Sequence, residues 1–327
     1  MRVTPQCDPI DTVIICDATF IQTDPAVAFN GTDYLVVWSD WRYAPDQEIA
    51  ARRVTPQGVA LDTSIFVGNA GNISEVYPAI AFDGNRCLVV WNRYTVPSRV
   101  EGRFLNGLGR PEGPIIGITT TLLSPWPNPK IAFDGTNYLV IFTDKPGGSN
   151  DVYGQLISPA GNLVGSRISI ATGSPNQSFA DVVWDRHCYV VVWTEDSCYV
   201  KGQRVAANGQ LIGSNFSISN TTSTTRFRPT IAAANTNYLV AWEQGVLNAY
   251  DIFGNVDQMV GVDEKTVIPF SKTRTPTIIS GSLPFSKTEK RKIHDISGRL
   301  VESSQLRPGI YFVEVDGRIT RKFIKVR

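Results

Sequence analysis

The sequence predicts an all-β fold: a five-bladed β-propeller with four-stranded blades, followed by a small β-sandwich-like module. Two observations predict it. First, one phrase recurs five times, and its anchor aromatics are spaced 53, 51, 51 and 49 residues apart, at Trp38, Trp91, Phe142, Trp193 and Trp242. Second, each copy carries the signals of four antiparallel strands and no helical pattern. A period of about 50 residues is typical of propeller blades or solenoid units, and four strands per period favour the blade.

The third copy shows the order of elements within one repeat. Residues 130–133 form a short apolar segment that reaches Asp134-Gly135, a strong hairpin signal because such a turn needs positive φ. Residues 138–142 are apolar at every position, as expected of a strand that is buried on both faces. Residues 151–158 alternate like a half-exposed strand, and a turn with Pro and Gly then leads to a weaker strand at 167–170.

Three kinds of residue recur for structural reasons. We expect the anchor Trp to fill the space between neighbouring blades. Glycine recurs in the third strand and predicts close packing or a bulge there, at Gly102, Gly154, Gly202 and Gly254, with Ala51 in the first copy. We expect Cys87 and Cys188 to be buried thiols in the slot that tyrosine holds in the other copies.

The predicted boundaries are 1–270 for the propeller and 271–327 for the module. The segment from Arg2 echoes the segment from Arg52, so the chain opens in the middle of a repeat. A ring that begins in mid-blade can use its first strand to complete its last blade. We favour this closure over a truncated gene whose earlier repeats are missing, although an outer strand at 259–268 would make the N-terminal strand redundant.

Composition excludes several classes of protein. Apolar content of 42% and charged content of 19% argue against wholesale disorder, and a net charge of +1 argues against a general nucleic-acid binder. No apolar run approaches the length of about 18 residues that a membrane span needs. The N-terminus lacks the apolar core of a signal peptide, so a signal has been removed or the native chain extends upstream.

Two stretches carry family resemblances. The repeat, as in "IAFDGTNYLVIF" (131–142) and "DVYGQLISPAG" (151–161), resembles a family of bacterial secreted β-propeller repeats of unassigned activity over roughly residues 2–259. The stretch "IHDISGRLVESSQLRPGIYFVEVDGRITRKFIKVR" (293–327) is similar to the C-terminal sorting domain of type IX secretion substrates, although the preceding "SGSLPFSKTEK" departs from the usual pattern. The second resemblance implies export by the type IX machinery, hence a secreted or cell-surface protein. The residues themselves predict a small β-module with a hairpin about Asp316-Gly317.

The loops predict a binding face. Loops between the second and third strands and the connections between blades should share one end of the ring, and they vary most between copies. Loops on a rigid scaffold are where function concentrates, and Trp, Tyr and Arg supply binding hot spots. We therefore predict a ligand site at Trp41, Arg42, Tyr43, Arg93, Tyr94 and Trp126. The leading hypothesis is a non-enzymatic binding or adhesion protein whose loop face recognises an extracellular polysaccharide or a protein.

Two alternatives stay open. Carboxylates recur just past the anchor aromatic, and two of them could act as acid and base of a five-bladed glycoside hydrolase: Asp40, Asp144, Glu195 and Glu243. The Asp-box motif of sialidases is absent from the sequence, which weighs against an enzyme. The other alternative is a structural unit of a surface assembly.

We expect no cofactor and no histidine-rich metal site, because the chain has 2 histidines; Ca²⁺ in Asp- and Asn-rich turns is a weaker alternative.

Overall fold

The computed structural model describes most of the chain, and it is all-β over that part. It covers residues 2–3, 9–42, 45–68, 71, 73–120, 124, 127–219, 225–234, 237–246, 249–258, 277–280, 291–295, 300–302, 309–315 and 318–326. No helix occurs among these residues. The chain divides into two compact units, Met1–Val262 and Asp263–Arg327. The predicted boundary at 270/271 lies eight residues further along the chain.

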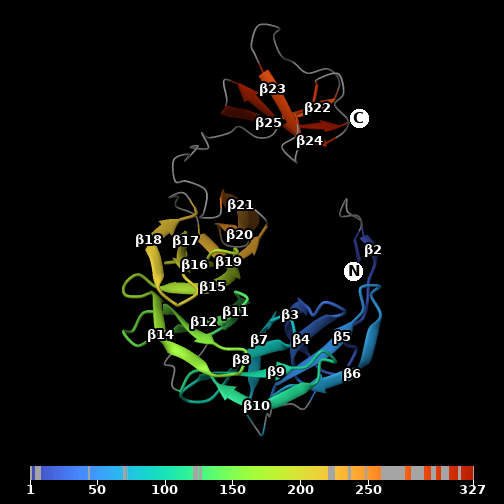
Figure 1. Cartoon of the computed structure of the whole chain (residues 1–327), viewed down its shortest axis with the longest axis vertical. Coiled ribbons are helices and arrows are strands. Elements are labelled where there is room, and N and C mark those ends of the chain that lie inside the picture. The colour runs from blue at the N-terminus through green and yellow to red at the C-terminus, as the bar shows by residue number, and fades with distance from the viewer. Residues whose placement is uncertain are drawn as a thin grey trace. The chain divides into compact units, whose positions relative to one another are not determined.

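Five antiparallel sheets follow one another in chain order around the first unit, and they confirm the five-bladed propeller (Figure 1). In each blade the strands run in sequence from the innermost outward. Blade 1 comprises β3 (Gln22–Phe29), β4 (Tyr34–Asp40), β5 (Glu48–Val54) and β6 (Ala60–Phe66). Blade 2 comprises β7 (Glu75–Phe82), β8 (Cys87–Arg93), β9 (Arg99–Leu105) and β10 (Pro111–Gly117). Blade 3 comprises β11 (Lys130–Phe133), β12 (Tyr138–Asp144), β13 (Asp151–Ile157) and β14 (Leu163–Ala171).

Blade 4 has the same four-stranded plan, and blade 5 has three strands among the described residues. Blade 4 comprises β15 (Gln177–Trp184), β16 (Tyr189–Glu195), β17 (Tyr199–Val205) and β18 (Leu211–Ser217). Blade 5 comprises β19 (Thr225–Ala233), β20 (Asn237–Val246) and β21 (Ala249–Gln258). The outer strand considered at 259–268 lies outside the described residues.

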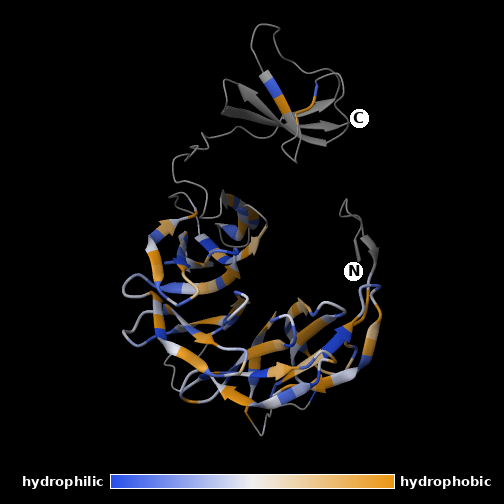
Figure 2. Cartoon of the chain, viewed as in Figure 1, coloured by the Kyte–Doolittle hydropathy of each residue, from blue (hydrophilic) through white to orange (hydrophobic). Residues whose placement is uncertain are grey.

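The hydrophobic core lies between blades, because the second strands of blades 1 to 4 are buried at nearly every position and so on both faces. Figure 2 shows the apolar residues spread over the strands of the ring. One buried cluster joins each neighbouring pair of blades from blade 1 to blade 5. Trp91 and Trp193 are fully buried in two of these clusters, as predicted for the anchor aromatics. Trp38 packs against Ile15 and Cys16 of the N-terminal segment. The packing of successive repeats, rather than any single sheet, therefore holds the ring together.

The recurrent glycines make the close approaches that the sequence predicted. A Cβ atom at Gly102 would lie 2.9 Å from the Val89 carbonyl oxygen, and one at Gly202 would lie 2.6 Å from the Phe216 ring. Strand pairing shifts register just after Gly202, as it does in a bulge. A side chain at these positions would force the third strand away from its neighbours.

Cys87 and Cys188 are buried thiols, but only one of them occupies the tyrosine slot. Cys87 pairs with Phe82 across the first hairpin of blade 2, whereas Tyr189 makes the equivalent pair with Trp184 in blade 4. Cys188 stands one residue earlier and is still 1% exposed. The assignment of Cys188 to the slot was therefore wrong: four residues separate Trp184 from Tyr189, just as four separate Phe82 from Cys87, so the slot of blade 4 falls on Tyr189.

The N-terminal residues form a small hairpin of the repeat type. Strand β1 (Arg2–Val3) pairs with β2 (Pro9–Asp11), and Val3 faces Pro9 just as Val54 faces Ala60 in blade 1. This register agrees with the sequence echo between the two segments. Neither strand belongs to the sheet of β19–β21 among the described residues, so completion of the last blade by the N-terminus stays a prediction.

The second unit is a four-stranded mixed sheet over its described residues. It orders β22 (Thr277–Ser280), β25 (Arg318–Val326), β24 (Gly309–Val315) and β23 (Arg291–Asp295). Strands β24 and β25 form the hairpin predicted about Asp316-Gly317, since Val315 faces Arg318. The described part of the chain holds no helix long and apolar enough to cross a membrane.

Candidate functional site

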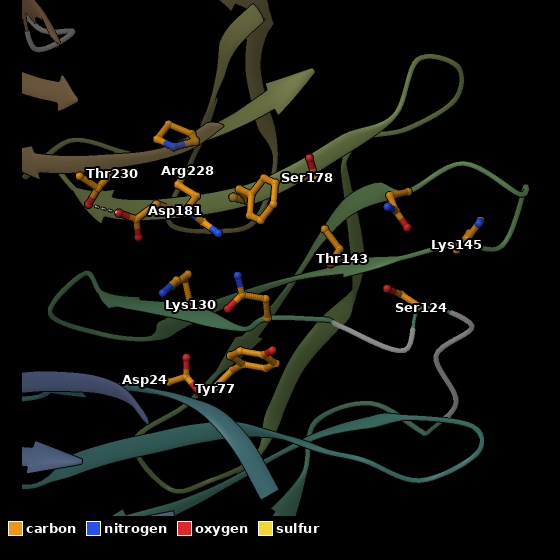
Figure 3. Close-up of a pocket in the computed structure, with 15 residues that line it drawn as sticks. Asp24, Tyr77, Ser124, Lys130, Thr143, Lys145, Ser178, Asp181, Arg228 and Thr230 are labelled. Carbon is orange, nitrogen blue, oxygen red and sulfur yellow. Dashed lines mark hydrogen bonds between the residues drawn. The ribbon is translucent and has the colours of Figure 1, made fainter. Parts of the chain in front are cut away.

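The innermost strands of all five blades surround one cavity of about 890 Å³ (Figure 3). Consecutive innermost strands contact one another from β3 to β19. The first strand of each blade therefore decides what the cavity presents to a ligand. The volume falls within the range of about 300–1,000 Å³ that is usual for small-molecule sites.

One residue of each innermost strand lines the cavity with a left-handed backbone. The five φ angles are 54°, 56°, 42°, 54° and 49°, at Asp24, Tyr77, Asn128, Phe179 and Arg228. All five stand at the same place in the repeat, five residues before the end of the strand. Non-glycine residues in this region cost of order 1–3 kcal/mol each, and such strain concentrates at functional sites.

A β-bulge produces this backbone in the innermost strands. Pairing with the second strand shifts register between Thr23 and Ala26 in blade 1, and at the matching positions of blades 2, 4 and 5. In blade 3 the left-handed residue lies just before β11. A bulge turns one side chain out of the alternation of the strand, and bulges are common beside active sites. Here it aims a different side chain into the cavity from each blade.

A second side chain per blade lines the cavity two residues later on three of the strands. These residues are Lys130, Asp181 and Thr230, whereas blades 1 and 2 carry Ala26 and Ala79 at the same position. Figure 3 shows Asp24 and Tyr77 on one side of the cavity and Asp181, Thr230 and Arg228 on the other. The lining is thus mostly polar and aromatic, and the residue at each of these two positions differs between most of the blades.

Contacts between blades fix several of these groups. Asp181 Oδ2 accepts hydrogen bonds from Thr230 Oγ1 at 2.8 Å and from the Ile231 amide at 3.0 Å, and Oδ1 accepts one from the Val182 amide at 2.9 Å. Burial, and then the nearby Asp24 carboxylate, raise the pKa of the Tyr77 hydroxyl. Neighbouring blades therefore meet through charged and polar groups inside the cavity.

Arg228 is held on two sides. Its Nη1 lies 3.3 Å from Glu243 Oε1, and its guanidinium carbon lies 5.8 Å from the centre of the Phe179 ring. The ion pair gives Arg228 an anionic neighbour, although the arginine side chain is largely exposed to solvent. The guanidinium group of Arg228 therefore lies near the Phe179 ring, within reach of a cation–π contact.

Loop residues form one end of the cavity. Ser124 comes from the connection between blades 2 and 3, and Lys145 and Asn150 come from the loop between β12 and β13. The Gln177 amide at the start of blade 4 donates to the Asn150 carbonyl at 2.7 Å. The two kinds of loop that we expected on one face thus meet beside the cavity in blades 3 and 4.

The binding residues predicted on the loops occupy other surroundings. Arg42 pairs with Asp40 at 2.9 Å and Arg93 pairs with Glu101 at 3.3 Å, each within its own blade. Trp41 is half-buried and Tyr94 is 45% exposed. None of these four is among the residues that line the described cavity. Tyr43 and Trp126 lie outside the described residues.

The carboxylates proposed for hydrolysis are all ion-paired. The pairs are Asp40 with Arg42 at 2.9 Å, Asp144 with Arg167 at 2.7 Å, Glu195 with Lys201 at 3.8 Å and Glu243 with Arg228 at 3.3 Å. Asp40 also accepts the Trp38 indole N–H at 2.9 Å, a role that Gln244 repeats for Trp242 at 3.1 Å. The structure therefore places these carboxylates in the scaffold, and the carboxylates that line the cavity are Asp24 and Asp181.

Sequence reasoning missed the five left-handed residues, although a signal was present. They stand inside the most constant segment of the repeat, yet Asp, Tyr, Asn, Phe and Arg occupy the same position in the five copies. Variation inside a constant strand marks a side chain that does not serve packing. In the described part of the chain, no three His, Cys, Asp or Glu side chains gather where they could hold a metal ion.

Comparison with known proteins identifies likenesses of fold. No family model matches the sequence, and no curated protein matches it. An α-L-arabinanase from Penicillium chrysogenum is similar at a TM-score of 0.48 with 15% identity, over 69% of this chain and 71% of that one. An α-L-arabinofuranosidase from Lactobacillus brevis is similar at 0.47 with 10% identity, over 72% and 90% of the two chains. A protein of unknown function from Dyadobacter fermentans is similar at 0.46 with 9% identity, over 75% and 96%.

Proposed function

We propose that the protein is a carbohydrate-binding propeller whose ligand enters the central cavity. The observation that carries this proposal is the set of five left-handed residues, which differ from blade to blade and line one space. Packing alone would favour the same residue in every copy. The five side chains differ, and each is held by a strained backbone. Such an arrangement suits a ligand that presents a different chemical group to each blade.

The chemistry of the lining fits a sugar. A pyranose has apolar C–H faces and hydroxyl groups around its edge. Tyr77 and Phe179 supply aromatic faces from blades 2 and 4, which flank blade 3. Asn128, Asn150 and Ser178 supply amide and hydroxyl groups in the same cavity. This combination suits a ligand that stacks and makes many neutral hydrogen bonds.

Glycoside hydrolysis is the second candidate, and the presence of Asp24 and Asp181 in one cavity favours it. Such enzymes need a pair of carboxylates, one of which gives or takes a proton. Asp181, however, accepts three hydrogen bonds from its own and the next blade. Only Asp24 is then left to act on a ligand, which makes binding without hydrolysis the better proposal.

The test is a glycan-array screen followed by calorimetry and a hydrolysis assay on the glycans that bind. Tyr77→Ala and Phe179→Ala should each weaken binding by about tenfold or more, since truncating a binding hot spot costs roughly 1–3 kcal/mol. Tyr94→Ala is the matched control, because Tyr94 is an exposed aromatic outside the cavity. Loss of binding in Tyr94→Ala alone would show that the ligand site lies on the loops and not in the cavity. Glycan cleavage that disappears in Asp24→Asn would make the protein a hydrolase.

We propose in addition that the C-terminal unit is an export signal of the type IX pathway and that the propeller acts outside the cell. The motif in residues 293–327 supports this proposal. In the native host, a chain without residues 286–327 should stay inside the cell, while the full chain reaches the surface or the medium. Normal export of the shortened chain would contradict the proposal. A purely structural role in a surface assembly is the outcome if the propeller is exported and binds no glycan.

A further inference from the structure

The side of the cavity formed by blade 3 carries two lysines that have no anionic partner among the described residues. Lys130 begins β11, and Lys145 follows β12 in the loop at the end of the cavity. No ion pair or side-chain hydrogen bond engages either ammonium group within the described part of the chain. Elsewhere in the propeller, Arg42, Arg86, Arg167 and Lys201 are each paired with a carboxylate. Within the described residues, the two lysines therefore form no ion pair that would stabilise the fold.

The carboxylates of the cavity do not neutralise them. Asp181 is occupied by Thr230 and by two backbone amides. Glu243, next to the cavity, is paired with Arg228. Asp24 stands on blade 1 and accepts a hydrogen bond from Ser39 Oγ at 3.5 Å. Asp24 and Asp181 keep their negative charge, but neither forms an ion pair with Lys130 or Lys145 among the described residues, so blade 3 presents two unpaired ammonium groups to the cavity.

The two lysines are attached at different depths of the wall. Lys130 pairs with Ile141 in β12, and Lys145 comes four residues after Ile141. Four residues of extended strand span roughly 13 Å. Asn128 and Asn150 line the cavity on the same side and can donate further hydrogen bonds. This wall suits a chain that bears acidic groups on more than one sugar unit.

From this arrangement we propose that the cavity selects an acidic oligosaccharide, whose carboxylates contact Lys130 and Lys145 while its sugar rings stack on Tyr77 or Phe179. The proposal rests on the proposed carbohydrate-binding function and names the ligand class. A carboxylate on a hexuronate unit is a small, flat anion that a lysine ammonium binds by a charge-assisted hydrogen bond. Neutral chains could still stack, but they would leave both ammonium groups without a partner.

The experiment measures calorimetric affinity of the full chain for oligogalacturonate, for oligoguluronate and for the methyl ester of each. The ester removes the charge and keeps the sugar. The parent should bind at least one acid about tenfold or more tightly than its ester, because hydrogen bonds to charged groups contribute more than neutral ones. Lys130→Gln and Lys145→Gln should each abolish most of that preference and leave affinity for the ester nearly unchanged. Lys201→Gln, whose lysine lies outside the cavity and is paired with Glu195, is the matched control and should bind like the parent.

The outcomes separate this inference from the function on which it rests. Equal affinity of the parent for acid and ester, or parent-like selectivity in both lysine variants, would overturn the acidic-sugar inference and leave carbohydrate binding standing. Binding of neither acid, ester nor any arrayed glycan would overturn both. Equally tight binding of poly-glutamate would show a general attraction for polyanions and would also overturn the inference. Circular dichroism of the variants establishes that each is folded before its affinity is compared.

Discussion

The Asp181 carboxylate of blade 4 joins the Thr230 hydroxyl and the Ile231 amide of blade 5, at 2.8 Å and 3.0 Å. The contact links two blades at the cavity wall, beside the apolar cluster to which Ile231 belongs. It also orients the Thr230 side chain. A polar clamp of this kind keeps the shape of the cavity fixed while its lining stays open to a ligand.

Asp181→Ala should therefore destabilise the propeller. Each lost hydrogen bond to a charged acceptor costs about 1.5–3 kcal/mol, and the Ile231 amide would be left without its partner. Denaturant unfolding should show a lower midpoint with an unchanged slope. Glu112→Ala is the control, because Glu112 is paired with Arg86 near the surface, where an ion pair contributes about 1 kcal/mol or less. Equal midpoints for Asp181→Ala and the parent would show that the clamp carries no stability.

The recurrent glycines give a second prediction. In Gly102→Ala, the new Cβ would lie 2.9 Å from the Val89 carbonyl oxygen, so backbone must move. Overpacking of this kind costs about 1–3 kcal/mol. Gly107→Ala is the matched control, because a Cβ at Gly107 meets nothing within 4 Å. Thermal unfolding should separate the two variants, and similar melting temperatures would contradict the packing role of Gly102.

Much of the scaffold could be predicted from the sequence because the repeat shows the same constraint several times over. The doubly apolar second strand, the Asp-Gly turns and the third-strand glycine each recur, and each has one physical explanation. The blade count and the burial of the anchor aromatics follow from these features. The position of Cys188 was missed because Cys188 and Tyr189 are adjacent and both buried, so a shift of one residue leaves the apolar pattern unchanged.

The cavity could not be predicted in the same way. Left-handed backbone at Tyr77 or Phe179 follows from a bulge in strand pairing, and local preference does not favour that conformation in an aromatic residue. The loop arginines were predicted to face a ligand, yet Arg42 and Arg93 find carboxylates in their own blades. Such pairing depends on which strands meet in space. A comparison of the five copies position by position would have shown the variable residue inside the constant strand.

The contact between blades 1 and 2 predicts a change in the titration of Tyr77. Burial raises the pKa of its hydroxyl, and the Asp24 carboxylate raises it further. Asp24→Asn removes the charge but keeps the size of the side chain, so the pKa of Tyr77 should fall toward its ordinary value and remain above it. Titration of ¹³C-labelled tyrosine by NMR measures this, with Tyr77→Phe to assign the signal. Asp62→Asn, on the outer strand of blade 1, should leave the signal unchanged. An unshifted pKa in Asp24→Asn would mean that the two side chains do not meet.

The buried thiols predict how stability depends on alkaline pH. Burial, and then the carboxylates of Asp83 and Asp185, raise the pKa of Cys87 and of Cys188 from 9.0 to about 12. Below pH 9 both thiols hold their protons in the folded and the unfolded chain, so the folded state keeps its full stability. Between pH 9 and about 12 the unfolded chain releases these protons and the folded chain retains them, so the free energy of unfolding falls as pH rises.

The expected loss is up to about 1.4 kcal/mol per pH unit for each thiol. Urea unfolding at pH 8 and pH 10 should show it in the parent. The double variant Cys87→Ala/Cys188→Ala should be less stable at pH 8, because it leaves two small cavities, but its free energy of unfolding should fall by roughly 2 kcal/mol less between the two pH values. Below about pH 10 the buried tyrosines contribute little, since an unfolded tyrosine titrates near 10. The same loss in parent and double variant would show that the thiols do not cause the alkaline destabilisation.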